Sequence, residues 1–320
     1  MSKRVMFIFK TACKYLIWLR LFCALVALFL AFSVLVAGTS PLMARTVRDH
    51  LGRKIKIPEK PERILSLAPS ITECLFALEQ GDRVIGVTQF SDYPPEAKKL
   101  PQVGSYVNLN LEKIVALKPD LCIGTKDGNP RSVIMRLEKL GVPVYAVDPR
   151  DLFAVMDTLS ELGDLLRAEQ RAKDVVQDMR ERIETVRSAV ARTKERPRVF
   201  FQIGISPIVS VGTDTFIHEL INLAGGKNLT AGSTPYPRIS REEVLRLQPE
   251  VLIITSMARD EVFERVKKEW LKWPNIPAVK NEQIYLVNSD HFDRATPRLV
   301  KGLERLFKLL HPKLYLKYAK

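Results

Sequence analysis

The chain has 320 residues, 46% hydrophobic and 27% charged, so its composition is that of a globular protein and excludes a disordered or coiled-coil chain. Its 50 basic and 36 acidic residues give a formal net charge of +14 at pH 7. The basic residues are spread along mixed-sign segments, without the clustered basic and aromatic stripes of a nucleic-acid binder, so we expect no nucleic-acid partner.

The first 44 residues form a leader of distinct composition. They carry basic but no acidic side chains, and the apolar run LFCALVALFLAFSVLVA (21–37) is followed by PLMA (41–44). This order is typical of a secretory signal cut after Ala44 and predicts export from the cytoplasm. The alternative is an uncleaved membrane anchor, because the apolar run is of marginal length for a span. A lipid anchor is disfavoured because Cys23 lies near the beginning of that run.

Residues 45–150 are predicted to form an N-terminal lobe in which strands and helices alternate. The stretches are, in order, RILSLA (63–68), SITECLFALEQ (70–80), RVIGVT (83–88), LEKIVALK (111–118), DLCIGT (120–125), SVIMRLEKLG (132–141) and VPVYAVD (142–148). This alternation predicts a Rossmann-like α/β lobe with parallel strands and helical crossovers. Cys74 and Cys122 fall in apolar stretches, so we expect two buried thiols rather than a disulfide.

Residues 151–196 are predicted to be a helical linker. Its main part, 168–195, contains no Gly or Pro, and Val175, Val176, Met179, Ile183 and Val186 recur at helical spacing. A helix of that length measures about 35–40 Å. A single long helix joining two lobes leaves a cleft between them, where ligands face the carboxyl ends of the strands.

Residues 197–320 are predicted to form a C-terminal lobe that repeats the first. LEKIVALKPDLCI (111–123) aligns without gaps on REEVLRLQPEVLI (241–253). VPVYAV (142–147) aligns on EQIYLV (282–287) and, more weakly, TECLFALEQG (72–81) on IHELINLAGG (217–226). Three matches in one order predict two α/β lobes with parallel-rich sheets. The first match brings Glu112 and Glu242 to equivalent positions.

Motifs of common enzyme classes are absent from the sequence. It contains no GxSxG, HExxH or GxxxxGK[ST], and no GxGxxG that follows a strand. Of the four histidines, only His291 lies in a loop expected at the cleft, and a lone His in a charged loop is more often a surface group than a metal ligand. We therefore expect neither catalysis, nor a cofactor, nor a metal site.

Three loops are expected to carry aromatic side chains into the cleft, and a fourth is expected to form its polar rim. The aromatic residues are Phe90, Tyr106 and Tyr236, and the fourth loop contributes Asp290, His291, Phe292, Asp293 and Arg294. A neighbouring guanidinium favours charged carboxylates, which is the reverse of what a general acid requires. The fourth loop therefore indicates a ligand rim, with a loop held by its own ion pair as the alternative.

Several segments in series resemble the cobalamin- and siderophore-type family of periplasmic substrate-binding proteins. They are SDYPP (91–95), NLEKIVALKPDLCI (110–123), DGN (127–129), RVFFQIGISP (198–207), SREEVL (240–245) and NSDHFDRATPRLV (288–300). The resemblance covers about residues 62–310. It implies two lobes joined by a rigid helix, and a periplasmic monomer that captures cobalamin or a related corrinoid and delivers it to the permease of an ABC importer.

The same resemblance assigns the site residues. It implies ligand contacts at Phe90, Tyr106, Tyr236 and residues 290–294. It also implies permease docking through Glu112 and Glu242, which are otherwise acids favoured by the dipole at a helix start. A siderophore- or haem-binding relative of the same scaffold is the alternative function, and a metal-dependent enzyme is the more distant one.

The chain departs from the family pattern at four aromatic positions. Phe90 stands where the best-known member has Tyr, Tyr106 and Tyr236 stand where it has Trp, and His291 replaces another Trp. Each exchange reduces the flat apolar area, so the affinity and the preferred ligand stay open. The family disulfide is not expected, because Ala224 occupies one of its cysteine positions.

Overall fold

The structure is a computed structural model that describes residues 44–255 and 261–318. The predicted leader, up to Met43, lies outside the described residues. Within the two described ranges, no helix combines the length and the apolar character needed to cross a membrane.

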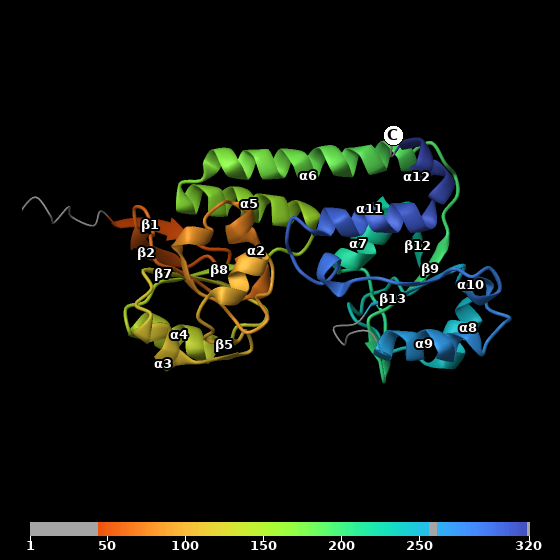
Figure 1. Cartoon of the computed structure of the whole chain (residues 1–320), viewed down its shortest axis with the longest axis horizontal. Helices are drawn as coiled ribbons and strands as arrows, with labels where there is room; N and C mark the ends of the chain where they lie inside the picture. The colour runs from red at the N-terminus through yellow and green to blue at the C-terminus, as the bar shows by residue number, and fades with distance from the viewer. Residues whose placement is uncertain (1–43, 256–260, 319–320) are drawn as a thin grey trace, which may run out of the picture. The chain divides into compact units, whose positions relative to one another are not determined.

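A four-stranded parallel sheet in the order β4-β3-β7-β8 forms the centre of the N-terminal lobe (Figure 1). Its strands are β3 (Ile64–Ser66), β4 (Val84–Gly86), β7 (Leu121–Thr125) and β8 (Val144–Val147). Helix α2 (Pro69–Ala77) covers one face, and α3 (Leu111–Ala116) and α4 (Arg131–Lys139) cover the other. Because helices cover both faces, β3 and β8 are buried at every residue, and β8 reads as a continuous apolar run.

Short elements complete this lobe. They are the strand pairs β1 (Ala44–Arg48) with β2 (Lys54–Pro58) and β5 (Gly104–Ser105) with β6 (Asn108–Leu109), and the 3-10 turns η1 (Gly81–Arg83) and η2 (Pro95–Lys99).

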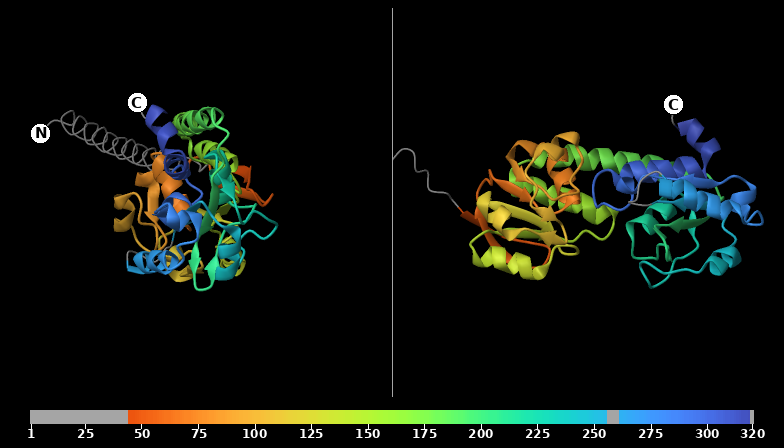
Figure 2. Two further views of the ribbon diagram at one scale, coloured as in Figure 1. Left: turned by 90° about the vertical axis from the view of Figure 1, so that its right-hand side faces the viewer. Right: turned by 60° about the horizontal axis from the view of Figure 1, so that its bottom comes forward.

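The C-terminal lobe has a second parallel sheet, in the order β12-β9-β13-β14. Its strands are β9 (Arg198–Gln202), β12 (Lys227–Asn228), β13 (Val251–Ile254) and β14 (Ile284–Leu286), with the hairpin β10 (Gly204–Ile205) and β11 (Ile208–Val209) beside them. The helices are α7 (Phe216–Leu223), α8 (Arg241–Leu247), α9 (Glu261–Leu271), α10 (Pro277–Lys280), α11 (Leu299–Leu310) and α12 (Pro312–Tyr318), and η3 (Ser289–His291) follows β14. Figure 2 shows the two sheets as separate bodies.

The internal repeat is confirmed by equivalent hydrogen bonds in the two lobes. In each lobe the arginine at the start of a central strand donates its side chain to the end of the repeated helix, and its backbone N–H donates to the carboxylate before the next strand. The bonds are Arg63 to Leu117 (2.7 Å) and Asp120 (3.1 Å), and Arg198 to Leu247 (2.6 Å) and Glu250 (2.8 Å). Lys118 and Gln248 are both left-handed at these helix ends. The two lobes therefore share one topology.

The linker contains two helices, α5 (Leu152–Leu166) and α6 (Glu169–Val190). Arg167 adopts the left-handed conformation between them, so α6 turns back along α5 and then continues beside α11 (Figure 1). The 22 residues of α6 measure about 33 Å. The helix ends five residues earlier than predicted, because the Thr193 hydroxyl accepts the Glu195 N–H in a local turn that competes with the helix.

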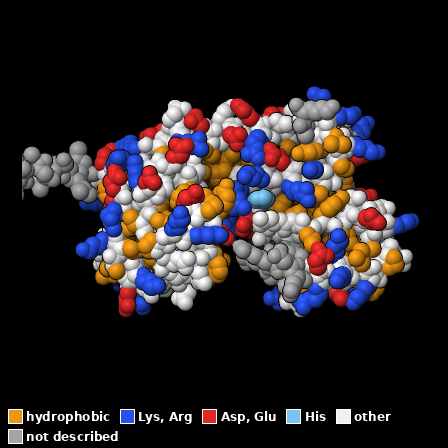
Figure 3. All heavy atoms as spheres, in the orientation of Figure 1, with side chains coloured by type: hydrophobic (Ala, Val, Ile, Leu, Met, Phe, Trp, Pro, Cys, Tyr) orange, Lys and Arg blue, Asp and Glu red, His pale blue; other side chains and the backbone are white. Residues whose placement is uncertain are grey.

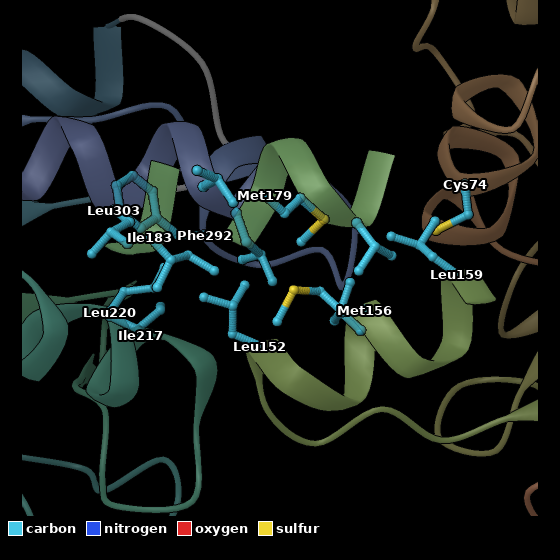
Figure 4. Packing of buried hydrophobic residues seen from close by; sticks show 14 of the residues in the cluster. Cys74, Leu152, Met156, Leu159, Met179, Ile183, Ile217, Leu220, Phe292 and Leu303 are labelled. Carbon is cyan, nitrogen blue, oxygen red and sulfur yellow. The ribbon is translucent and has the colours of Figure 1, made fainter. Parts of the chain in front are cut away.

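One apolar core runs through both lobes along α5, α6 and α11. Figure 4 shows it passing from Cys74 and Leu159 through Met179 to Leu303. Separate cores lie beneath α3 and α4 and beneath α8 to α10. Cys74 belongs to the shared core and Cys122 to the core under α3 and α4. Both thiols are buried and free, as predicted, and burial raises the pKa of each.

Candidate functional site

The loops that follow β4 and β14 carry most of the predicted ligand-contact residues, namely Phe90 and residues 290–294. In a parallel sheet, the carboxyl ends of all strands share one edge, which is where ligands bind in open α/β folds. Figure 3 shows the surface hollowed between the two lobes, on the side away from α6. The site residues on these loops therefore lie at the edges formed by the carboxyl ends of the two sheets, where the sequence predicted ligand contacts.

The side chain of Phe90 is 53% exposed. Its loop is anchored by the residues on either side of it. A chain of buried hydroxyl groups ties the loop to β3 and α2: Ser66 to Thr72 (2.8 Å), Thr72 to Ser91 (2.9 Å) and Thr88 to Ser91 (3.1 Å). Ser91 points inward, and the Phe90 ring is left accessible beside it. An exposed phenyl ring on a loop fixed in this way is suited to contact a ligand.

Tyr106 is half-buried and packs over Gly128. A Cβ atom at Gly128 would lie 2.8 Å from the Tyr106 ring, so the ring requires glycine there. The Asn129 amide donates to the carbonyls of Tyr106 (2.9 Å) and Leu67 (2.8 Å). The DGN segment therefore forms a support that fixes the Tyr106 ring.

Tyr236 is 57% exposed, and charged groups of both lobes act on its hydroxyl. Partial desolvation raises its pKa, and the negative charge of Asp293 in the C-terminal lobe adds to the effect. The N-terminal lobe contributes Arg150 and Asp127, which form an ion pair at 2.6 Å. Our sequence reasoning did not assign Arg150 or Asp127, although Asp127 stands in the quoted DGN segment.

Phe292 is not a rim residue, which corrects the sequence-based assignment. It is 1% exposed, and its ring lies 5.4 Å, centroid to centroid, from that of Phe201 in the shared core (Figure 4). The reason is the 3-10 turn η3, in which the Asn288 side chain accepts the Asp290 N–H. The chain leaves this turn with Phe292 directed inward, where it gains apolar burial.

His291 lines a pocket of about 440 Å³ inside the C-terminal lobe. The pocket lies between the start of η3 and helices α11 and α12, and its wall includes Lys301, Arg305, Lys308 and Tyr315. Desolvation lowers the pKa of His291, and the charges of Arg298 and Lys301 lower it further, so the imidazole is neutral at pH 7. His291 thus belongs to a basic pocket whose lining residues all come from one lobe.

Asp293 is exposed to solvent in the loop that follows η3. Desolvation, together with the negative charge of Asp290, raises its pKa to about 7, and Arg294 opposes this shift. Asp293 therefore changes its charge near neutral pH.

Arg294 does not present a free guanidinium, which corrects the expectation that it faces a ligand. Its Nη1 lies 2.8 Å from Glu73 Oε1 and 3.1 Å from Asp92 Oδ1, both in the N-terminal lobe. Its Nη2 lies 3.3 Å from Asp290 Oδ1. Arg294 is therefore held by ion pairs, but most of its partners lie in the other lobe rather than within its own loop, as the alternative had expected.

Arg298 completes this group, which we call the interlobe ion cluster: Glu73, Asp92, Asp290, Arg294 and Arg298. Arg298 Nη1 lies 3.2 Å from Glu73 Oε1, and its Nη2 lies 3.5 Å from Asp290 Oδ2. Glu73, Asp92 and Arg298 were missed. A signal existed for Glu73, because a carboxylate inside the apolar helical run ITECLFAL must be paired if it is buried.

Glu112 and Glu242 occupy the first turns of α3 and α8, and both are exposed. Each helix begins at a side-chain cap: Asn110 accepts the Lys113 N–H, and Ser240 accepts the Glu243 N–H. Helices α3 and α8 cover corresponding faces of the two sheets. The two glutamates are therefore equivalent in structure as well as in sequence.

Among residues 44–255 and 261–318, no group of three or more His, Cys, Asp or Glu side chains could hold a metal ion.

Comparisons with known proteins identify a matching family and similar proteins. A family described as "Periplasmic binding protein" matches residues 64–291. The vitamin B12-binding protein of Vibrio parahaemolyticus is 35% identical over 247 residues, which span 77% of this chain and 88% of that protein.

Two solved structures have the same fold. The periplasmic vitamin B12-binding protein BtuF of Vibrio cholerae superposes with a TM-score of 0.69 at 34% identity, covering 81% of this chain and all of that one. The apo form of the periplasmic heme-binding protein RhuT from Roseiflexus sp. RS-1 gives a TM-score of 0.69 at 28% identity, covering 81% and 99%.

Proposed function

The chain belongs to the periplasmic binding protein family, and from that premise we propose that it captures cobalamin or a related corrinoid and delivers it to an ABC importer. One observation carries the proposal. The exposed aromatic side chains Phe90 and Tyr236 and the half-buried, fixed Tyr106 come from both lobes of a chain that is similar to vitamin B12-binding proteins.

The chemistry of a corrinoid matches these groups. Its ring is large, rigid and apolar on its faces, so it gains from stacking on aromatic side chains. Its rim carries amides, which donate to carboxylates and accept from guanidiniums. Asp293 and the Arg150–Asp127 pair offer both kinds of group near Tyr236, and we assign them, in place of Arg294 and Phe292, to the polar rim.

Delivery would use the equivalent acids of the two lobes. Glu112 and Glu242 are exposed at the same point of the repeat, which suits a permease built from two similar subunits with basic residues at matching places. In this proposal the chain works as an exported monomer in the periplasm, and it either loses its leader or stays attached by it.

Competitive titration tests the ligand assignment. We expect cobalamin to bind 1:1 and to be displaced by neither haem nor a ferric siderophore at equal concentration. Tyr106→Ala and Tyr236→Ala should each weaken binding by about 1–3 kcal/mol through lost apolar and stacking contact. Trp273→Ala, which removes another partly exposed aromatic side chain, is the control and should bind as the parent does. Tighter binding of haem would establish the alternative function.

A further inference from the structure

Glu73 is the most buried member of the interlobe ion cluster. Its side chain is 2% exposed, against 26% for Asp92 and 25% for Asp290. A single oxygen, Oε1, accepts from both Arg294 and Arg298. Water can replace a partner at the two partly exposed carboxylates, but the buried Glu73 is paired by two guanidiniums of the opposite lobe.

The cluster also fixes the loop that carries Phe90. Arg294 Nη2 donates to the Phe90 carbonyl at 3.4 Å, and the Arg298 guanidinium stacks 4.2 Å from the centroid of the Tyr93 ring. On the other side of the same loop, Ser91 is bonded to Thr72, the residue before Glu73. Residues 88–95 are thus held both by their own lobe and by two arginines of the other lobe.

The second loop is fixed by the same contacts. Arg294 and Arg298 bracket the segment that continues into α11, and both also pair with Asp290. The Cys74 thiol lies 3.7 Å from the carbonyl of Ala295, in the middle of this segment. Two adjacent residues of α2, Glu73 and Cys74, therefore face one short stretch of the C-terminal lobe.

We propose that Glu73 is a positioning residue for ligand capture: it holds residues 88–95 and 290–298 against each other, so that the aromatic and polar groups of the two lobes face a ligand in one fixed arrangement. Glu73 itself touches no ligand. The inference rests on the proposed function, because ligand capture is what the arrangement serves. Without Glu73, the two arginines lose their common buried partner and the loops sample other arrangements.

The test uses Glu73→Gln in the full chain, which keeps the size of the side chain and removes its charge. Glu62→Gln is the matched control, because Glu62 is exposed and pairs with Lys60 (2.8 Å) in its own lobe. If the competent arrangement falls to about one tenth of the population, the apparent Kd for cobalamin rises about tenfold. Hydrogen exchange should quicken in residues 88–95 and 290–298 of the Glu73 variant only, while α5 and α6 exchange as in the parent.

Parent-like affinity in a folded Glu73→Gln chain, or unchanged exchange in either loop, overturns the inference. If the Glu73→Gln chain does not fold, Arg298→Lys is tested instead. This substitution keeps the positive charge but loses the forked contact, so hydrogen exchange should quicken in the same two loops. A parent chain that binds no cobalamin refutes the proposed function instead. In that case, hydrogen exchange in residues 88–95 and 290–298 is the measurement that decides whether Glu73 positions the two loops.

Discussion

Replacing Arg294 by Ala removes a cation that contacts three carboxylates, and we expect a large loss of stability. Glu73 then keeps its contact with Arg298, at 3.2 Å. Breaking a buried ion pair costs about 3–5 kcal/mol, and because Arg298 stays in place we expect about 2–4 kcal/mol. For a chain of this size, that loss lowers the Tm by roughly 3–7 °C.

The pH dependence identifies the cause. Burial already raises the pKa of Glu73, and removing Arg294 raises it further, so protonation relieves the unpaired charge. The loss measured by thermal or urea unfolding should therefore be smaller at pH 5 than at pH 8. Arg187→Ala, which removes an exposed arginine paired with Glu184 at 3.3 Å, should change stability by less than about 0.5 kcal/mol. Equal effects of the two substitutions would refute the reasoning.

Three further predictions follow from the positions of single residues. Phe292→Ala should lower the free energy of unfolding by about 3–5 kcal/mol, whereas Phe153→Ala, at an exposed position, should lower it by less than about 0.5 kcal/mol. Similar losses for the two variants would show that Phe292 is not buried. Changing both Glu112 and Glu242 to Lys should abolish import through a reconstituted permease while cobalamin binding in solution stays unchanged; normal import would reduce both residues to helix-start acids. The folded-state pKa of Asp293, about 7, lies above its unfolded value of about 4, so the folded chain binds the extra proton and this contribution to stability falls as pH rises from about 4 to 7. The Tm of Asp293→Asn minus that of the parent should therefore increase between pH 5 and pH 8. If the two Tm profiles run parallel, the raised pKa of Asp293 is contradicted.

The repeat could be predicted from the sequence because it depends on local signals. Each copy begins at a capping side chain, ends at a left-handed residue before Pro, and leads into a buried apolar strand. The buried thiols and the accessible Phe90 and Tyr236 were predictable for a similar reason. Residues in an apolar stretch tend to be buried, and residues in a Pro- and Gly-rich loop tend to be exposed, so a local pattern is enough to predict both.

The roles of Arg294 and Phe292 could not be predicted in this way. The two N-terminal partners of Arg294 lie 221 and 202 positions away in the chain, and no local pattern pairs them. The inward direction of Phe292 depends on the 3-10 turn before it, which a loop rich in charged residues conceals. Glu73 did leave a signal in the sequence, because it is a charged residue inside an apolar helical run.

The most direct test of the account is an absorbance spectrum of the purified chain mixed with cobalamin and then separated from free ligand by gel filtration. We expect the corrinoid bands to elute with the protein at one cobalamin per chain, and a chain that carries both Tyr106→Ala and Tyr236→Ala to retain little or none. A protein peak without corrinoid absorbance, from a folded chain at micromolar concentration, would contradict it.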